Sequence, residues 1–276
     1  MTGPALPAPK DRVCRLVKRE ALGGDYVLLT FEHNEVARAH AGQFAMIQPE
    51  EGSDLLLRRP FSIMDTDAAT GRFTIFLKAV GPGSKAVFDL REGEKARVLG
   101  PLGHGFTLPA PGERVFLVGG GYGVAPFALF SHGLKGAGAG FHLFYGGRSA
   151  SELPLLGELE QRGIPLTLST DDGTRGERGR VTAPLLKALG AEKGKARLYA
   201  CGPEAMMRAV ARIAAERDVP CEVSLDPWMG CGVGTCLGCV VKIQESGELR
   251  WKNRPACTEG PVFDSKRVVW PHEQHA

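Results

Sequence analysis

The chain has 276 residues, a formal net charge of +3 and 43% hydrophobic residues. These values are typical of a globular protein of about two domains, and the small charge without a run of Lys and Arg argues against nucleic-acid binding. Residues 115–134 contain no Asp, Glu, Lys or Arg, and this uncharged stretch is long enough to span a bilayer. Because glycines and Pro126 interrupt this stretch, we expect a strand, a turn and a helix there and no membrane span.

The first part of the chain, residues 1–110, has the pattern of a small antiparallel β-barrel. Short apolar or alternating segments lie at residues 27–31, 44–47 and 73–77, and clusters of Gly, Pro and Asp separate them. Alternation over such short runs is typical of strands joined by tight turns.

Residues 111–221 change to a rhythm of strand followed by helix, which predicts a parallel sheet with crossover helices. The expected segments are 115–118, a helix after Gly123, 141–145, 154–161, 166–169, 183–189, 197–200 and 205–217. The first strand runs into Gly119, Gly120, Gly121 and Gly123, where a pyrophosphate could approach the backbone and a helix N-terminus. A tight turn without a ligand would also explain these glycines. A second strand-turn-helix contains Cys201, Gly202 and Pro203.

The last part, residues 222–276, carries four cysteines with the spacing C-x4-C-x2-C followed by a distant fourth: Cys231, Cys236, Cys239 and Cys257. This is the spacing of plant-type [2Fe–2S] sites, so we expect these thiolates to be the metal ligands. Gly232, Gly234 and Gly238 would give the loop its freedom and leave N–H groups able to bond sulfur.

Structural zinc is the alternative reading of the four cysteines, although zinc sites usually show two C-x2-C pairs. A disulfide framework is disfavoured because the chain has seven cysteines, an odd number, and no signal peptide is recognisable. We therefore expect a reducing, cytoplasmic location. Cys14 and Cys221 lie in apolar surroundings and are expected to be core thiols.

Together these motifs support a family resemblance. Arg59-Pro60-Phe61-Ser62 in the barrel, the glycine-rich turn and Cys201-Gly202-Pro203 resemble the ferredoxin–NADP reductase superfamily. With the cysteine loop and the segment 257–264, the chain resembles the electron-transfer subunit of B-type dihydroorotate dehydrogenase from about residue 12 to residue 270. The loop at residues 229–242 is the most specific part of the resemblance.

The resemblance implies an FAD site on the barrel. Arg59 would bind the FAD pyrophosphate, as a cation with several fixed donors suits a diphosphate, and Ser62 would hydrogen-bond the flavin ring. The other residues implied are Pro60, Phe61, Phe76, Leu77, Lys78, Gly83 and Ser84. An isolated arginine at this position would instead be interpreted as a partner in a salt bridge at the edge of the barrel.

For the nicotinamide nucleotide, the resemblance implies that Gly119, Gly120, Gly121 and Gly123 contact phosphates and that Cys201, Gly202 and Pro203 lie beside the nicotinamide. Asp171 opens a loop that matches the nucleotide face of the family, although a solvated turn explains it equally well. The segment 147–149 could grip a 2′-phosphate, whereas the family analogy favours NADH over NADPH.

The expected function is that of an NAD-linked flavin iron–sulfur oxidoreductase subunit. Electrons from a dihydroorotate-oxidising catalytic flavoprotein subunit would pass through a [2Fe–2S] cluster and FAD to NAD+ in pyrimidine biosynthesis, in a heterotetramer. Because the cofactors carry the bond chemistry, we assign no acid-base or nucleophilic residue. Trp228, beside the cysteine loop, could anchor the partner or pack in the core of the small module.

Three other functions fit the same residues. The chain could serve another NAD(P)-linked complex, of the ferredoxin–NADP reductase, sulfide dehydrogenase or hydrogenase type. It could be a redox-sensing module that controls a partner without turnover, or a zinc-stabilised nucleotide-binding protein.

Overall fold

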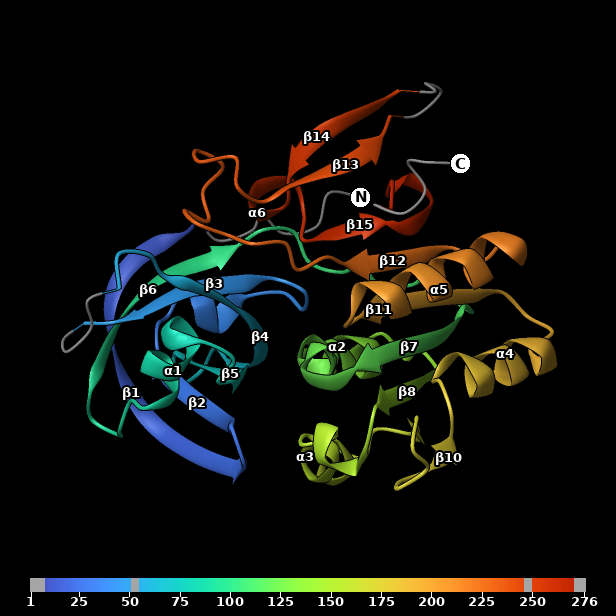
Figure 1. The fold of residues 1–276 in the computed structure, drawn as a ribbon, viewed down its shortest axis with the longest axis horizontal. Coiled ribbons are helices and arrows are strands. Elements are labelled where there is room, and N and C mark those ends of the chain that lie inside the picture. Colours follow the sequence, from blue (N-terminus) through green and yellow to red (C-terminus); the bar gives the residue numbers. More distant parts are fainter. Residues whose placement is uncertain (1–7, 51–54, 246–249, 271–276) are drawn as a thin grey trace.

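The computed structural model describes residues 8–50, 55–245 and 250–270. In these residues the chain forms a closed barrel, a mixed sheet flanked by helices and a two-stranded hairpin (Figure 1). Barrel and sheet lie side by side, and the cysteine-bearing segment lies across the top of both. None of the helices in the described part of the chain is long and apolar enough to cross a membrane.

The barrel confirms the predicted antiparallel architecture. Its strands are β1 (Lys10–Gly23), β2 (Tyr26–Glu32), β3 (Phe44–Pro49), β4 (Arg59–Asp67), β5 (Arg72–Lys78) and β6 (Lys95–Leu102). They close in the order β1-β2-β5-β4-β3-β6, with every neighbouring pair antiparallel. The short helices η1 (Val36–Arg38) and α1 (Pro82–Phe88) follow β2 and β5. Leu16, Phe31, Phe73 and Ile75 are fully buried inside it.

The second unit is the predicted parallel α/β domain. Its strands are β7 (Arg114–Gly120), β8 (Phe141–Gly147), β9 (Leu166–Thr170), β10 (Glu177–Arg178), β11 (Ala196–Cys201), β12 (Cys221–Ser224) and β15 (Val262–Asp264). They lie in the order β10-β9-β8-β7-β11-β12-β15, parallel except for the last pair.

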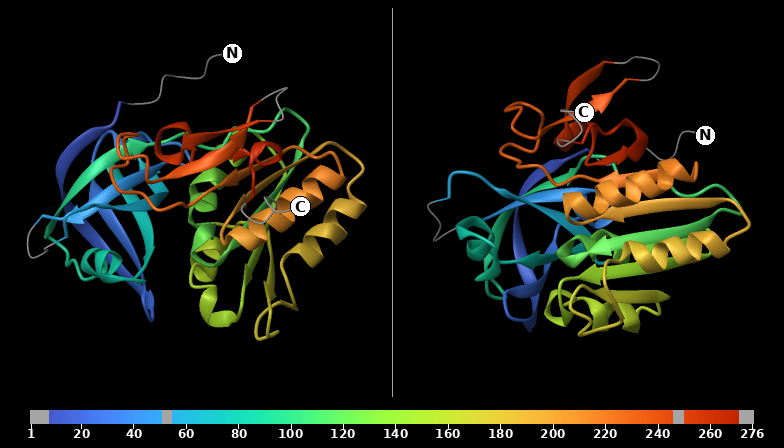
Figure 2. Two further views of the ribbon diagram at one scale, coloured as in Figure 1. Left: turned by 45° about the horizontal axis from the view of Figure 1, so that its top comes forward. Right: turned by 45° about the vertical axis from the view of Figure 1, so that its right-hand side comes forward.

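Helices cover both faces of this sheet (Figure 2). They are η2 (Gly121–Val124), α2 (Ala125–Gly136), η3 (Ala150–Glu152), α3 (Leu156–Gln161), α4 (Thr182–Ala191) and α5 (Glu204–Glu216). Val115 and Leu117 of β7 belong to the core that includes α2, α3 and the barrel, whereas Phe116 and Val118 belong to the core under α4 and α5. The two faces of β7 therefore pack into two different cores, because successive side chains of a strand point to opposite faces of the sheet.

The C-terminal segment contains β13 (Val240–Gln244), β14 (Trp251–Pro255), α6 (Ala256–Glu259), β15 and η4 (Ser265–Arg267). The expected domain boundary between residues 221 and 222 falls inside β12, and β15 pairs with β12 at the edge of the sheet. This pairing satisfies backbone groups that an edge strand would otherwise leave open. The division into three domains stays a prediction. In the structure, β15 of the C-terminal segment forms hydrogen bonds with β12 of the nucleotide-binding sheet.

An aromatic group joins the barrel to the sheet. Phe106, in the connection after β6, stacks on Phe127 and contacts Phe130 of α2, with ring centroids 5.5 and 5.2 Å apart. Tyr199 of β11 meets the Phe106 ring edge-on and donates its hydroxyl hydrogen to the Thr107 carbonyl at 2.7 Å. The connection is therefore packed into the core rather than free.

We expect Phe106→Ala to lower the free energy of unfolding by about 3–5 kcal/mol, because it leaves a cavity among these aromatic rings. Urea denaturation followed by circular dichroism measures the loss. Leu108→Ala is the matched control: its side chain is 54% exposed, so the change should stay within about 0.5 kcal/mol. Equal losses in both variants would contradict the proposed packing role.

Candidate functional site

The cysteine loop lies between β12 and β13, and α6 supplies the fourth cysteine. Four backbone N–H groups point at sulfur atoms. Val233 and Cys236 each donate to Sγ of Cys231 at 3.4 Å. Gly234 donates to Sγ of Cys257 at 3.2 Å, and Gly238 donates to Sγ of Cys236 at 3.5 Å. The segments that carry the four predicted ligands thus lie together, and the loop is folded so that amides face the thiols.

Two of the three expected glycines have the backbone conformation for which glycine was predicted, and Gly238 donates its N–H to sulfur as predicted. Gly232 and Gly234 have φ of 77° and 81°, a region that favours glycine. A Cβ on Gly232 would lie 2.6 Å from the Met46 side chain. Gly238 is different: the left-handed residue there is Leu237, with φ of 55°.

The four thiols differ in environment. Cys239 and Cys257 are buried, whereas Cys236 is exposed. Burial, with a hydrogen bond to Cys239, raises the pKa of the Cys257 thiol to about 12. Burial also acts to raise the pKa of Cys231, but the N–H groups of Cys236 and Val233 outweigh it and lower that pKa to about 6. Hydrogen bonds that stabilise the thiolate form are typical of a cysteine sulfur that binds a metal.

In residues 8–50, 55–245 and 250–270, no group of three or more His, Cys, Asp or Glu side chains is placed to hold a metal ion. The assignment of the four cysteines as ligands therefore stays a prediction. Its support is their spacing, the left-handed glycines and the amides directed at sulfur.

The buried side of the cysteine segment packs on the barrel. Cys239 and Cys257 share a small core with Phe44, Met46 and Leu102, which come from β3 and β6. In the β3–β4 register, Met46 is opposite Pro60 and Phe44 is opposite Ser62. β3 therefore lies beside both the two buried cysteines and the predicted flavin segment. Met46, which we did not predict, is the link, and nothing in the local sequence marks it.

The predicted FAD residues are brought together by β4, β5 and α1. The Arg59 guanidinium lies so close to Gly83 that a Cβ on Gly83 would overlap its Nε atom. Arg59 Nη1 donates to the Leu57 carbonyl at 2.7 Å and to the Arg58 carbonyl at 3.1 Å. The two predicted segments therefore meet at this arginine.

Other predicted FAD residues have different surroundings. The Ser84 hydroxyl accepts from the N–H groups of Val80 and Gly81 at 2.9 and 3.0 Å, so it holds the turn before α1. Phe76 and Leu77 are buried in the barrel core. The Lys78 Nζ lies 5.1 Å from the centre of the Tyr26 ring.

The predicted nucleotide-binding turns touch each other. Cys201 is opposite Gly119 in the β7–β11 register. A Cβ on Gly123 would lie 2.5 Å from the Gly202 Cα atom, and Gly202 has φ of 150° with its own Cβ position 2.9 Å from Gly120. Close backbone approach thus explains these glycines. Burial raises the pKa of the Cys201 thiol to about 12, so it is a neutral thiol.

The Asp171 loop follows β9 and lies beside the end of β8. The Asp171 N–H donates to the Gly147 carbonyl at 3.1 Å, and the Asp171 side chain is exposed. Arg148 is held by Glu152, with Nε to Oε1 at 2.8 Å. This arrangement brings the Asp171 loop and the segment 147–149 together, and it is compatible with both a solvated turn and a nucleotide-binding loop.

Sequence analysis named Trp228 as a candidate but missed other exposed apolar side chains near the predicted sites. Tyr122 is 52% exposed in η2, which contacts β5, the strand of the second flavin segment. Trp228 is 92% exposed, so the alternative that packs it in the core of the small module is wrong. Leu56 is 91% exposed, and Leu57 lies 3.8 Å from the ideal Cβ position of Gly230. Exposure of these apolar groups is visible only in three dimensions.

Comparisons with known proteins agree with this geometry. Residues 226–269 match the family described as the iron–sulfur cluster binding domain of dihydroorotate dehydrogenase B, and residues 117–212 match the oxidoreductase NAD-binding domain. A dihydroorotate dehydrogenase B (NAD(+)) electron transfer subunit from Desulforamulus reducens is 38% identical over 243 residues, which cover 88% of this chain and 92% of that protein. One from Caldanaerobacter subterraneus subsp. tengcongensis is 31% identical, with 93% and 97% covered.

Among solved structures, a chain from a structure described as an NADH-dependent reduced ferredoxin–NADP oxidoreductase has a TM-score of 0.82. It is 30% identical, and the match covers 99% of this chain and 92% of that chain. The ferredoxin reductase of carbazole 1,9a-dioxygenase has a TM-score of 0.68 at 22% identity, with 79% and 68% covered, and shows the fold alone.

Barrel, nucleotide-binding sheet and cysteine segment define an NAD-linked oxidoreductase with the ferredoxin reductase fold and an added iron–sulfur binding domain. The relatives that cover nearly all of the chain are more specific. The chain belongs to the family of electron transfer subunits of dihydroorotate dehydrogenase B. The predicted family and fold class are thereby confirmed, and the iron–sulfur match favours a cluster over zinc.

We expect Gly232→Ala to destabilise the cysteine loop by about 1–3 kcal/mol, because alanine is strained at φ of 77°. Iron and acid-labile sulfide per chain, measured after anaerobic purification, should fall. Gly238→Ala is the matched control, since φ is not positive there and a Cβ would lie at an ordinary 3.6 Å from Cys236 Sγ. Equal cluster content in both variants would refute the strain argument.

Proposed function

We propose that this chain passes electrons from a dihydroorotate-oxidising flavoprotein subunit through a [2Fe–2S] cluster and FAD to NAD+ in cytoplasmic pyrimidine synthesis. Cys231, Cys236, Cys239 and Cys257 would hold the cluster. Arg59, Ser62 and the turn at Gly83 would hold FAD, and the turns after β7 and β11 would hold the nicotinamide nucleotide.

One observation carries the proposal: the barrel contacts both the cysteine segment and the predicted nucleotide-binding turn. On one side, Met46 connects the buried cysteines to Pro60 in the flavin segment. On the other side, β5 contacts η2 of the nucleotide-binding turn. A nicotinamide takes electrons as a hydride pair and a cluster takes them singly, whereas a flavin exchanges both, so this order suits a flavin in the middle.

Arg59 and Gly83 fit a diphosphate. The guanidinium lies against Gly83, a residue without a side chain, and a guanidinium with several fixed donors suits phosphate oxygens. The Ser84 hydroxyl holds the turn in this shape. Ser84 therefore supports the site by shaping the turn.

NADH is the nucleotide that the charges favour. Glu152 binds the Arg148 side chain and also accepts from the Arg148 N–H at 3.0 Å. The exposed Asp171 lies in the adjoining loop. Paired in this way, Arg148 offers little attraction to a 2′-phosphate, and a further carboxylate repels one. Apparent affinities for NADH and NADPH, measured side by side, test this preference.

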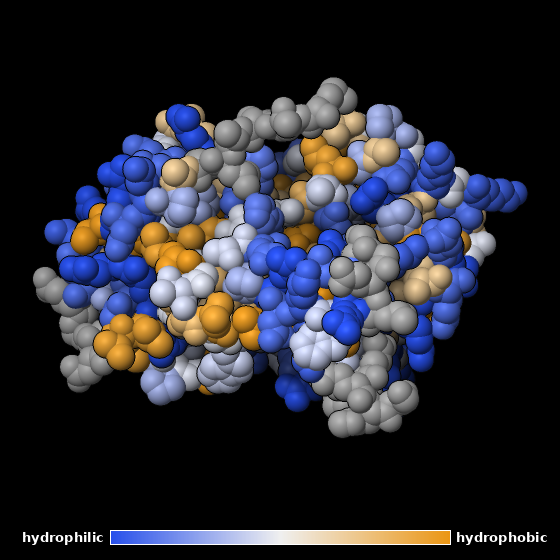
Figure 3. Space-filling view, turned by 90° about the horizontal axis from the view of Figure 1, so that it is seen from above, coloured by the Kyte–Doolittle hydropathy of each residue, from blue (hydrophilic) through white to orange (hydrophobic). Residues whose placement is uncertain are grey.

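The partner subunit would bind over the cysteine loop. Trp228, Val233 and Leu237 are exposed there, and Leu56 and Leu57 lie nearby in the β3–β4 connection. Figure 3, which views the cysteine-bearing top of the molecule, shows hydrophobic patches on this face. Exposed tryptophan and leucine beside a redox site suit an interface between subunits. A heterotetramer with two copies of each subunit would use this face twice.

A second candidate comes from the solved structure with a TM-score of 0.82, whose description names an NADH-dependent reduced ferredoxin–NADP oxidoreductase. This chain could serve a complex of that kind, with a different partner on the same face. The fold and cofactors would be the same, so the partner decides between the two functions.

The deciding experiment uses the native complex, purified without oxygen. Dihydroorotate and NAD+ are added, and NADH formation is followed. NADH formation that stops when this chain is removed, while the remaining subunit still reduces a dye with dihydroorotate, supports the proposal. If added NADH reduces the flavin and the cluster but dihydroorotate and NAD+ give no NADH, the second candidate is favoured. Sustained NADH turnover with an artificial acceptor argues against a redox-sensing module.

We expect Cys239→Ser to block electron transfer from the partner while NADH still reduces the flavin, because the cluster would lie on the partner's side of the flavin. Rapid mixing followed at the flavin absorbance measures both steps. Cys14→Ser is the control: it replaces a buried barrel thiol that is close to the Arg12 carbonyl and outside the cysteine loop. Loss of both steps in Cys239→Ser alone would overturn the proposed order.

We expect Gly83→Ala to lower the FAD content per chain, because the new Cβ would displace the Arg59 guanidinium. Loss of one charge-assisted contact to phosphate weakens binding by about 1.5–3 kcal/mol, roughly 10–150-fold. Gly81→Ala in the same turn is the control, since its Cβ would meet no atom within 4 Å and its φ is −166°. Equal FAD retention in the two variants would exclude this role of Arg59.

A further inference from the structure

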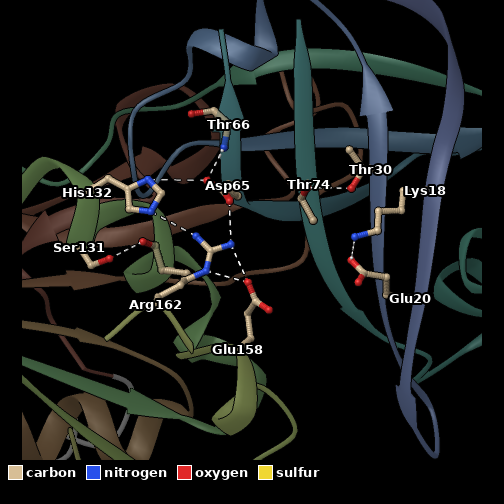
Figure 4. A network of polar contacts seen from close by, with 11 residues as sticks. Lys18, Glu20, Thr30, Asp65, Thr66, Thr74, Ser131, His132, Glu158 and Arg162 are labelled. Carbon is tan, nitrogen blue, oxygen red and sulfur yellow. Dashed lines mark hydrogen bonds and ion pairs between the residues drawn. The ribbon is translucent and has the colours of Figure 1, made fainter. Parts of the chain in front are cut away.

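A group of charged side chains lies at the junction of the barrel and the nucleotide-binding domain. Figure 4 shows Arg162 in its centre, with Asp65, Glu158 and His132 around it. Arg162 Nη2 donates to Asp65 Oδ2 at 2.7 Å, and Nε donates to Glu158 Oε1 at 2.8 Å. Nη1 lies 3.3 Å from His132 Nε2. All three guanidinium nitrogens are therefore engaged.

The partners come from different domains. Asp65 is in barrel strand β4, whereas Arg162 follows α3, and His132 is in α2. The Arg162 and Asp65 side chains are only 18% and 26% exposed, so solvent screens their attraction less than on an open surface. Burial acts to lower the pKa of Arg162, but the carboxylates of Asp65 and Glu158 outweigh it, and the pKa is raised. The guanidinium therefore stays charged.

The contact adds direction to the apolar packing between the barrel and the nucleotide-binding domain. Helix α2 packs against β4, and one apolar core extends from the barrel into the sheet. Apolar packing does not depend on direction, whereas a planar guanidinium that donates to a carboxylate of the other domain accepts a narrow range of positions. Lys135 Nζ, from α2, also donates to the Arg162 carbonyl at 2.6 Å. The turn after α3 is thus held from α2 and from the barrel.

Both elements held by this group lead to a proposed cofactor site. Strand β4 carries Arg59 and Ser62, and Asp65 is three residues further along it. Helix α2 begins directly after the turn at Gly121–Val124, and His132 lies on it. A shift of the barrel against α2 would therefore change the separation of the flavin segment and the nicotinamide turn.

We propose that Arg162 and Asp65 are positioning residues that hold the flavin segment and the nicotinamide turn in register for hydride transfer. This inference rests on the proposed function. Neither residue touches a reacting atom, so their effect acts through the relative position of the two domains. Displacement of reacting groups by about 1 Å can slow a reaction about a hundredfold, which makes transfer between the two sites the sensitive step.

The test compares Arg162→Gln and Asp65→Asn in the FAD-loaded chain. We expect NADH-driven flavin reduction, followed by rapid mixing, to slow about 10–100-fold in each. The double variant should be no slower than the worse single variant, because both remove one interaction. Glu158→Gln is the matched control: it removes a neighbour of Arg162 within the nucleotide-binding domain and leaves the contact with Asp65, so its rate should stay within about twofold of the unchanged chain.

Hydrogen exchange gives a second readout that does not depend on turnover. In Arg162→Gln and Asp65→Asn, amides of β4 and of the turn after α3 should exchange faster, and the NADH dissociation constant should stay unchanged. Hydrogen exchange reports the contact between the domains whether or not the chain turns over NADH. Faster exchange without NADH turnover would contradict the proposed function alone, whereas unchanged exchange would contradict this inference. Asp65→Asn is nearly isosteric and decides the matter if Arg162→Gln does not fold. Unchanged reduction rate and exchange in Asp65→Asn, or equal slowing in Glu158→Gln, would overturn the proposal.

Discussion

Strand β4 is the constraint on which the site depends. It pairs with β3, which shares a small apolar core with Cys239 and Cys257, and it packs against α2 of the nucleotide-binding domain. Its own first residues form the predicted flavin segment. Any displacement of β4 therefore changes two proposed electron-transfer separations at once. The barrel meets this constraint by closure, because a closed sheet has no free edge along which β4 could slip.

The cysteine segment has a buried side and an exposed side. Cys239 and Cys257 face the barrel, whereas Cys236 is exposed near Leu237. The buried side leads to Met46 and the flavin segment, and the exposed side is free for another protein. Amide hydrogen bonds to Cys231 and Cys257 come from the loop itself, so this short segment supplies three of the predicted ligands and hydrogen bonds to their sulfur atoms. Electrons would enter on the exposed side and leave on the buried side.

Local sequence patterns predicted the order of the strands and helices and the residues of each predicted site segment. Alternation and short apolar runs predicted the barrel, and the glycine-rich turn after an apolar strand predicted the nucleotide-binding domain. Contacts between distant segments were not predictable. Gly83 is needed because Arg59 lies against it, and Gly202 because it meets Gly120 and Gly123. The Ser84 hydroxyl accepts hydrogen bonds from its own turn, which the local sequence does not reveal.

The C-terminal segment could not be placed from the sequence, because β15 is three residues long and its pairing with β12 is non-local. That pairing has a functional consequence. The Leu225 N–H donates to the Pro261 carbonyl at 2.8 Å, and Glu222 accepts from the Thr107 N–H at 3.0 Å in the connection from the barrel. The cysteine loop is therefore tied at both ends to the sheet and through Glu222 to the barrel connection. A segment held in this way suits electron transfer along a fixed path, with no need for the cluster domain to swing between its partners.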